Sequence, residues 1–372
     1  MLHQGFEMYG SDKSFLSFCK NQTLFESAKT DIIISREGPL SKELNKSPYQ
    51  LFYYGMGRLP IHVIKKNPFK YLLIFFKDLF TALTVLRGYE FVYINTIAPM
   101  AWIVASAILN KRRCIHIREI PKARITLLIS LFLVKNCKVI FNSSETQRHF
   151  KSFFHLNKTF VNNGVKEMEL DHNESNGYSD IFKEGCFNVL IPGRINSWKG
   201  QDFILESIKK YGPIYENINW IFAGDVALDQ EWRYRELKKI IDYDSVDNIH
   251  FLGWRNDLAN LMFYSDLVIV PSVKPEPFGR VVIESMSIGK IVLASNHGGP
   301  SKIITDGVNG FVFHPLNDQS FRDKLISVKN LNNADKKVIE TAAKKEFQHK
   351  YSEKIYLNNL VNELKKHFIK YN

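Results

Sequence analysis

The stretch PSVKPEPFGRVVIESMSIGKIVLASNHGGPSKIITDGVNG, residues 271–310, decides the fold class. Two short apolar runs, at 267–270 and 291–294, enclose a loop rich in proline and glycine and then, at 281–288, the first turns of a helix. The prolines lie before this helix, where they keep the chain in a loop. A strand, loop, helix and strand in this order predict a parallel α/β sheet.

Two carboxylates, Glu276 and Glu284, lie on either side of the predicted helix start. Backbone N–H groups at a helix start have no partner within the helix, so the place suits a phosphate or a polyol flanked by acceptors. Acidic residues are also common there because the helix dipole favours them. The spacing alone leaves both interpretations open.

Loops after neighbouring strands supply further polar residues. Ligands of parallel sheets bind at the carboxyl ends of the strands, where Gly298 and Gly299 follow one apolar run and GRINSWKG, residues 193–200, follows another. The second loop contains two cations, Arg194 and Lys199. Cations beside helix starts indicate a diphosphate, and nearby carboxylates indicate hydroxyl groups. This combination predicts a nucleotide-sugar site.

Five short motifs in a fixed order carry a family resemblance. They are the two glutamates seven residues apart, the cationic loop, FAGD at 222–225, FLGW at 251–254 and DGVNGFVF at 306–313. With them, the C-terminal half resembles the retaining family-4 glycosyltransferases of the GT-B fold, also called glycosyl transferases group 1, of the bacterial surface-polysaccharide type. The likeness covers residues 186–350 strongly and 5–170 weakly.

The resemblance implies two Rossmann-like α/β domains that face each other across a cleft. Residues 1–170 would bind the acceptor and residues 186–350 the nucleotide-sugar, joined by a polar linker at 171–185. The last segment, 351–372, would form a helix that returns to the N-terminal domain. The apolar patterns place strands and helices in the first domain; the strands are at 31–34, 49–54, 91–94, 114–117, 139–141 and 159–161, and the helices at 14–27, 68–86, 100–109 and 126–134.

The resemblance also implies roles for the polar residues. Arg194 and Lys199 would bind the donor diphosphate and stabilise the charge on the departing nucleotide, each contributing about 3 kcal/mol to the transition state. Glu276 would hold hydroxyls of the transferred sugar, and Glu284 those of the ribose. The remaining donor-site residues would be Phe278 and Gly279, through their backbone N–H groups, with Gly298, Gly299 and, beside the base, Trp254.

Two places in the first domain are expected to face the cleft. His116 and Arg118 end a strand, in the motif HIRE, where the family often has a second histidine in place of the arginine. His116 would take part in catalysis by helping to bind the donor sugar, and Arg118 would belong to the donor-binding residues. Gly10 lies in a loop where its small size would let the backbone approach the donor or acceptor closely. Only six residues precede Glu7, so we expect the first strand of this sheet to be missing, through a late start codon or a truncation.

The implied reaction is transfer of a hexosyl-type group from a UDP- or GDP-linked sugar to a lipid-linked or oligosaccharide acceptor, with retention of configuration and without metal or cofactor. The products would be O-antigen, capsule or exopolysaccharide units. Asp242 and Asp244 match the Asp-x-Asp metal motif of another glycosyltransferase fold, but they end a charged helical pattern. A nucleotide-sugar epimerase and a non-catalytic nucleotide-sugar-binding or membrane-assembly protein stay open as alternatives.

Composition agrees with a two-domain globular protein. The chain has 372 residues, of which 45% are hydrophobic, enough for two large cores. Its four cysteines show no metal-ligand spacing and are expected to be reduced thiols in a cytosolic protein. Residues 1–14 lack a signal-peptide pattern, and the longest apolar run, 125–134, is too short to span a bilayer.

The formal net charge of +12 is concentrated in the first half of the chain. Residues 1–183 contain 25 Lys and Arg against 15 Asp and Glu. These cations alternate with aromatic and aliphatic residues around 65–80 and 112–124. A solvated helix face and an anionic membrane surface both explain the pattern; no nucleic-acid motif accompanies it. The family likeness favours a peripheral protein on the inner face of the plasma membrane.

Overall fold

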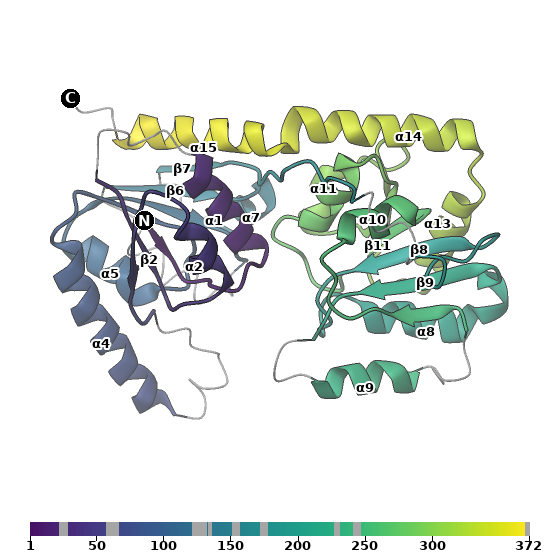
Figure 1. The fold of residues 1–372 in the computed structure, drawn as a ribbon, viewed down its shortest axis with the longest axis horizontal. Helices are drawn as coiled ribbons and strands as arrows, with labels where there is room; N and C mark the ends of the chain where they lie inside the picture. The colour runs from purple at the N-terminus through teal and green to yellow at the C-terminus, as the bar shows by residue number, and fades with distance from the viewer. Residues whose placement is uncertain are drawn as a thin grey trace. The chain divides into compact units, whose positions relative to one another are not determined.

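The computed structural model describes residues 1–21, 29–56, 67–120, 132, 136–150, 157–171, 178–226, 231–240 and 247–368. The chain forms two compact units, the first made of Met1–Gly164 and Glu353–Asn372 and the second of Val165–Ser352. Each unit is a parallel sheet between helices, as predicted (Figure 1). The helix expected at 126–134, apart from residue 132, and the Asp242–Asp244 motif lie outside the described residues.

Unit 1 contains a seven-stranded sheet in the order β3-β2-β1-β4-β5-β6-β7. All neighbouring strands in it are parallel. The predicted strands appear within a few residues of their expected bounds. The inner strands are apolar and largely buried on both faces, whereas the edge strands β3 and β7 are partly exposed. The strands are β1 (Leu2–His3), β2 (Asp31–Ile34), β3 (Gln50–Tyr53), β4 (Phe91–Ile94), β5 (Arg112–Ile117), β6 (Cys137–Phe141) and β7 (Asn157–Phe160).

The first strand is present, which corrects the expectation that the chain lacks it. β1 lies at the centre of the sheet, where Leu2 pairs with Ile33 of β2 and Ile94 of β4. The backbone N–H of Asn95 donates to the carbonyl oxygen of Leu2 at 3.0 Å. Two residues suffice because both neighbouring strands already supply the hydrogen-bonding edges that a central strand needs.

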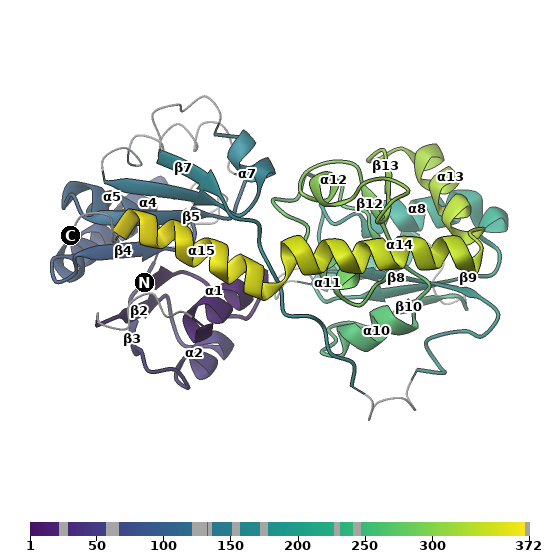
Figure 2. The same cartoon turned by 90° about the horizontal axis from the view of Figure 1, so that it is seen from above.

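Helices cover both faces of this sheet. One apolar cluster joins the first face to residues of α1, α2 and α15, among them Phe15, Leu40 and Tyr356. The other joins the opposite face to α4 and α5, including Leu86 and Trp102. Figure 2 shows α15 lying across the sheet of unit 1. The helices of unit 1 are α1 (Gly10–Asn21), α2 (Pro39–Leu44), α4 (Pro68–Leu86), α5 (Met100–Ile108), α7 (Ser144–Arg148) and α15 (Glu353–Phe368).

Unit 2 contains a six-stranded parallel sheet in the order β10-β9-β8-β11-β12-β13. Its strands are β8 (Phe187–Pro192), β9 (Ile218–Ala223), β10 (Ile249–Phe251), β11 (Leu267–Val270), β12 (Val292–Ser295) and β13 (Phe311–Phe313). Its helices are α8 (Gln201–Tyr211), α9 (Glu231–Ile240), α10 (Leu258–Tyr264), α11 (Arg280–Ser287), α12 (Pro300–Ile303), α13 (Asp318–Lys329) and α14 (Asn333–Glu346), with a 3-10 turn, η2 (Gly212–Tyr215), and a π-helical turn, η4 (Phe347–Tyr351).

The chain passes between the units outside the stretch 171–185 that was expected to be the linker. The passages fall after Gly164 and after Ser352. Described residues of the expected linker instead pack in unit 2, where the hydroxyl of Tyr178 donates to Asp257 at 2.7 Å. Their polar composition resembles a linker, but their tyrosine and isoleucine side chains are buried. None of the helices in the described ranges combines the length and apolar character that a bilayer crossing requires.

Candidate functional site

The strand order of unit 2 creates a place where two loops separate. β8 is followed by β9 on one side, whereas β11, which pairs with β8 on the other side, comes later in the chain. The loops after β8 and β11 therefore leave the sheet in opposite directions at its carboxyl edge. In open α/β sheets such a switch point is where ligands bind. Both loops carry residues that the sequence singled out.

The loop after β8 is fixed by its own polar groups and by two glycines. The side-chain oxygen of Asn196 accepts hydrogen bonds from the backbone N–H groups of Trp198 and Lys199, both at 3.0 Å. Gly200 has φ of 82°, and a Cβ there would lie 1.9 Å from the carbonyl oxygen of Pro271. Only glycine fits this position, so the loop of β8 lies directly against the start of the loop of β11.

An ion pair joins the two loops. The ammonium of Lys199 lies 2.7 Å from Oε1 of Glu276, and the two side chains are 16% and 7% exposed. The hydroxyl of Ser272 donates to the same Oε1 atom. No hydrogen bond from a described residue reaches Oε2 of Glu276. One oxygen of the carboxylate is thus held in place while the other can accept from a ligand.

The surroundings of Glu276 keep it ionised. Burial alone would raise the pKa of this carboxyl group. The charge of Lys199 and the hydrogen bonds from Lys199 and Ser272, with a smaller contribution from His297, outweigh burial and lower the pKa below its usual value. The site therefore presents a carboxylate that accepts hydrogen bonds at neutral pH.

The loop after β12 supports the Glu276 loop from behind. Gly298 has φ of 63°, and a Cβ there would lie 2.5 Å from the backbone nitrogen of Glu276. The backbone N–H of Gly299 donates to the carbonyl oxygen of Glu276 at 2.8 Å. Nε2 of His297 donates to the carbonyl oxygen of Ser272 at 2.6 Å. The two glycines thus position the glutamate, and they need not touch a ligand to matter.

Helix α11 starts immediately after this loop. Gly279 precedes it with φ of 101°, a conformation that glycine adopts without strain. Glu284 lies one turn into the helix, where its Oε1 accepts a hydrogen bond from Nε of Arg280 at 2.7 Å. Phe278 is buried and packs edge-on against Tyr351. Its side chain therefore belongs to the core, which leaves its backbone as the group that can serve a ligand.

The two other predicted residues of unit 2 differ in their surroundings. Arg194 lies in the loop after β8 and is half-buried. Trp254 follows β10, two strands away from β8, and its side chain is 70% exposed. The structure brings Lys199, Glu276, Gly298 and the start of α11 together in one place. Trp254 lies at the same carboxyl edge without a contact to them that would define its role.

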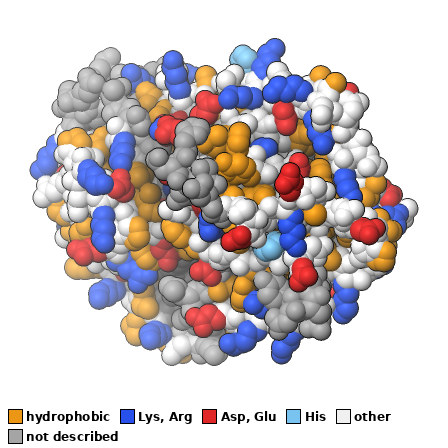
Figure 3. Space-filling model, turned by 45° about the vertical axis from the view of Figure 1, so that its right-hand side comes forward, with side chains coloured by type: hydrophobic (Ala, Val, Ile, Leu, Met, Phe, Trp, Pro, Cys, Tyr) orange, Lys and Arg blue, Asp and Glu red, His pale blue; other side chains and the backbone are white. Residues whose placement is uncertain are grey.

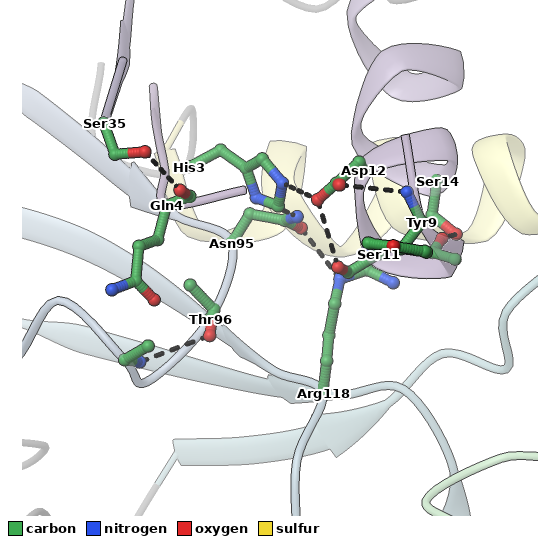
Figure 4. Close-up of polar contacts among 12 residues, drawn as sticks. His3, Gln4, Tyr9, Ser11, Asp12, Ser14, Ser35, Asn95, Thr96 and Arg118 are labelled. Atoms are coloured by element: carbon green, nitrogen blue, oxygen red, sulfur yellow. Dashed lines mark hydrogen bonds and ion pairs between the residues drawn. The ribbon is translucent and has the colours of Figure 1, made fainter. Parts of the chain in front are cut away.

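Unit 1 has a switch point of its own, between β1 and β4. A buried polar cluster lies there, with groups from β1, from α1 and from the residues that directly follow β4 and β5 (Figure 4). Nε2 of His3 donates to Asp12 at 2.7 Å, and the side-chain N–H of Asn95 donates to Nδ1 of His3 at 3.0 Å. Burial is the main reason why the pKa of His3 is lowered, although Asp12 opposes it. A Cβ on Gly5 would lie 1.8 Å from Asp12. Among the described glycines of unit 1, Gly5 thus has its backbone closest to a neighbouring group, the side chain of Asp12.

Gly10, the glycine that the sequence singled out in this loop, is the first residue of α1. Its carbonyl oxygen accepts a hydrogen bond from the hydroxyl of Ser14 at 3.0 Å. This contact belongs to the first turn of the helix. The role of Gly10 toward a donor or acceptor stays a prediction.

His116 and Arg118 are not open to solvent, contrary to the expectation from their place at a strand end. His116 is fully buried, with Nδ1 2.8 Å from the hydroxyl of Tyr93, and burial together with the charge of Arg118 lowers its pKa well below the usual value. Arg118 is 6% exposed and donates to Asn95, Asn163 and Tyr356 at 2.7 to 2.9 Å. Its guanidinium group joins the end of β5 to α15. Nε2 of His116 is buried and has no hydrogen-bond partner among the described residues. The roles of both residues toward a ligand stay predictions.

Sequence reasoning missed two kinds of residue. Ser272, four residues before Glu276, fixes the carboxylate, and a serine directly after a strand in the same loop is a usable signal for it. His3 and Asp12 form the buried pair of unit 1, but nothing in their spacing of nine residues marks them. The pair depends on the fold of a loop that no short motif describes.

Comparison with known proteins shows a family likeness in unit 2. Residues 180–345 match the family model of the glycosyl transferases group 1. The match covers most of unit 2 and less than half of the chain. An uncharacterized glycosyltransferase of Methanocaldococcus jannaschii is 28% identical over 46% of this chain and 46% of that protein. The lipopolysaccharide 1,2-N-acetylglucosaminetransferase of Salmonella typhimurium is 34% identical over 42% of each. The chain therefore aligns with under half the length of these relatives.

Solved structures extend the likeness to the fold of both units. The Anabaena protein HepE in complex with UDP and glucose matches with a TM-score of 0.79 at 21% identity, over 98% of each chain. A glycosyltransferase from Rickettsia africae matches with a TM-score of 0.79 at 20% identity, over 100% of this chain and 99% of that one. The fold is thus the GT-B fold of glycosyltransferases, with two Rossmann-like units.

Proposed function

We propose that the protein is a glycosyltransferase that moves a sugar from a nucleoside-diphosphate sugar to an acceptor. The observation that carries the proposal is the buried pair of Lys199 and Glu276 at the switch point of the unit that matches the group 1 family. A carboxylate with one fixed and one open oxygen suits sugar hydroxyls, and an ammonium beside it suits a diphosphate. The Anabaena structure with UDP and glucose supports this donor class.

Each residue of the site has a role in the proposal. Lys199 and Arg194 bind the diphosphate and stabilise the charge that develops on it, by about 3 kcal/mol each. Glu276 accepts from hydroxyls of the sugar, next to the N–H groups at the start of α11. Glu284 accepts from the ribose through the oxygen that Arg280 does not hold, and Trp254 flanks the base. No metal or cofactor takes part.

Retention of configuration is part of the proposal. The leaving phosphate oxygen would take the proton of the attacking acceptor hydroxyl on the same face of the sugar, so that no covalent enzyme intermediate forms. In such a reaction the protein positions the substrates and stabilises the developing charge with its own fixed charges. The buried side chain of His116 would support the acceptor unit from within. The acceptor would be lipid-linked or an oligosaccharide in bacterial surface-polysaccharide synthesis, at the inner face of the plasma membrane, and the Salmonella relative supports this setting.

A donor screen followed by three variants tests the proposal. A bound donor raises the melting temperature by mass action, so UDP- and GDP-sugars are first compared by thermal shift. We expect Lys199→Ala, Arg194→Ala and Glu276→Ala each to abolish transfer while circular dichroism shows a folded protein. Lys209→Ala, on α8, serves as the control. Full transfer by folded Lys199→Ala would refute the assignment.

The same assays separate the two alternatives. An epimerase would convert the donor in the absence of any acceptor, which product analysis by chromatography detects. A non-catalytic binding protein would show the thermal shift but no product with lipid-linked and oligosaccharide acceptors. Either result would replace the proposed transfer reaction.

A further inference from the structure

Helix α4 of unit 1 is apolar on its solvent side. Phe69, Leu73, Phe76 and Phe80 are 79%, 73%, 55% and 74% exposed. Their positions, at i, i+4, i+7 and i+11, place them on one stripe along the helix. Figure 1 shows α4 at the periphery of unit 1. Four large side chains exposed along one helix form a continuous apolar surface, unlike the single exposed residues that are common on proteins.

The stripe is separate from the face with which α4 packs on its own unit. Ala82 and Leu86 are 0% and 1% exposed and belong to the apolar cluster under the sheet. Asp78, the only acidic residue of α4, is 8% exposed on the same inner side. Asn67 caps the start of the helix, because its side-chain oxygen accepts from the backbone N–H of Lys70 at 3.0 Å. Its position is thus fixed without any use of the stripe.

The charges around the stripe favour an anionic partner. Lys70 and Lys77 are exposed along one edge of it, about two turns of the helix apart. The excess of positive charge belongs to this unit alone. Unit 1 contains 27 Lys and Arg against 12 Asp and Glu, a formal charge of +15, whereas unit 2 contains 23 against 26, or −3. Lys and Arg occur over much of the face that Figure 3 draws, interspersed with Asp and Glu.

We propose that the solvent side of α4 is a docking surface for a bilayer of anionic phospholipids. The stripe of Phe69, Leu73, Phe76 and Phe80 enters the headgroup region, and Lys70 and Lys77 face lipid phosphates. An apolar stripe flanked by lysines on a helix parallel to the bilayer is the usual form of an interfacial helix. The positive unit adds long-range attraction to an anionic leaflet. This surface is independent of the donor site in unit 2.

Vesicle sedimentation with the full-length protein tests the surface. The vesicles contain equal parts phosphatidylcholine and phosphatidylglycerol, or phosphatidylcholine alone. We expect binding to the anionic vesicles, weakened by salt, and much less binding to the neutral ones. The double variant Phe76→Ser with Phe80→Ser should lower the partition coefficient at least about tenfold, because two apolar side chains leave the bilayer. Lys70→Glu with Lys77→Glu should lower it at least about tenfold as well.

Matched variants in unit 2 control for general effects of polarity and charge. Trp232→Ser with Val338→Ser removes exposed apolar residues, 49% and 68% exposed, from two other helices. Lys239→Glu with Lys345→Glu reverses two exposed charges on the same helices. Both controls should bind anionic vesicles as the unaltered protein does. All four variants change exposed residues, and circular dichroism checks that each is folded.

Three results would overturn the proposal. The first is equal binding by the unaltered protein and the α4 variants. The second is equal binding to neutral and anionic vesicles, which would remove the role of charge. The third is self-association that depends on protein concentration and that Phe76→Ser with Phe80→Ser abolishes, without vesicle binding, as analytical ultracentrifugation would detect. In that case the stripe is an interface between copies of the chain.

Discussion

Replacing Lys199 by methionine removes the cation from a buried ion pair and keeps most of the length of the side chain. The Glu276 carboxylate, 7% exposed, then keeps only the hydroxyl of Ser272 as a described side-chain partner. Breaking a buried pair from one side costs about 3–5 kcal/mol. Because Lys199 itself is 16% exposed and water can reach its place, we expect the lower end, about 3 kcal/mol.

A second variant separates the loss of the pair from the loss of a side chain. Lys199→Met combined with Glu276→Gln removes both charges, while the glutamine can still accept from Ser272. We expect the free energy of unfolding of this double variant to lie within about 1 kcal/mol of that of the unaltered protein, since an uncharged methionine and glutamine replace the ion pair. Urea unfolding followed by tryptophan fluorescence suits the measurement, because four of the five tryptophans belong to unit 2.

The pH dependence gives an independent check with a defined sign. In the unaltered protein the pKa of Glu276 is below its usual 4.5, so its contribution to stability is present above that pH and is lost as pH falls through the folded-state pKa. Without Lys199, burial raises the pKa of Glu276. Protonation of Glu276 at low pH then removes the unpaired buried charge that destabilises the variant. The stability difference between the two proteins should therefore shrink below about pH 5. A Lys199→Met protein of unchanged stability at neutral pH, or a double variant as unstable as the single one, would refute the reasoning.

Three further predictions concern packing and protonation. Gly298→Ala should lower the free energy of unfolding by at least about 2 kcal/mol more than Gly307→Ala. Both glycines have positive φ, but a Cβ at Gly298 would clash with the neighbouring loop backbone, whereas a Cβ at Gly307 would have nothing within 4 Å. Equal urea midpoints of the two variants would contradict this. Arg118→Met should lower the free energy of unfolding by about 3 kcal/mol, against about 0.5 kcal/mol for the exposed Arg87→Met, as measured by circular dichroism. The pKa of His116 is lowered, so the folded state stays unprotonated while the unfolded state takes up a proton below its ordinary 6.5. His116→Gln should therefore reduce the loss of stability on acidification from about pH 6 to 5 by up to about 1.4 kcal/mol. If urea unfolding shows the same dependence of the free energy of unfolding on pH in both proteins, His116 is not a buried neutral imidazole.

Local patterns predicted the elements and the loops that carry the candidate site. Three elements have the bounds that the sequence predicted. The strands at 31–34 and 91–94 follow from short apolar runs, and the helix at 68–86 follows from its apolar pattern and the proline at its start. The joining of Lys199 to Glu276 follows in outline from two parallel strands whose loops end at one edge. The sheet topology brings those loops together whatever their exact sequence.

Distant contacts set the features that the sequence did not reveal. A strand-end position predicted an accessible Arg118, but its guanidinium group donates a hydrogen bond to the hydroxyl oxygen of Tyr356, 238 residues later, and is buried. The two-residue strand β1 looked too short to exist, yet both of its neighbours come from residues that follow it by about 30 and 90 positions. Neither partner can be recognised within a window of a few residues.

The assignment of α15 to unit 1 has a consequence for how the chain folds during synthesis. Unit 2 is one continuous segment, Val165–Ser352, whereas unit 1 needs the last helix as well as the first 164 residues. Tyr356, Leu360 and Leu364 fill one of its cores. Domains usually fold in the order in which the ribosome makes them. For this chain we expect the reverse order: the second unit can complete its core while the first lacks α15, and Arg118 lacks Tyr356, until the last helix has left the ribosome.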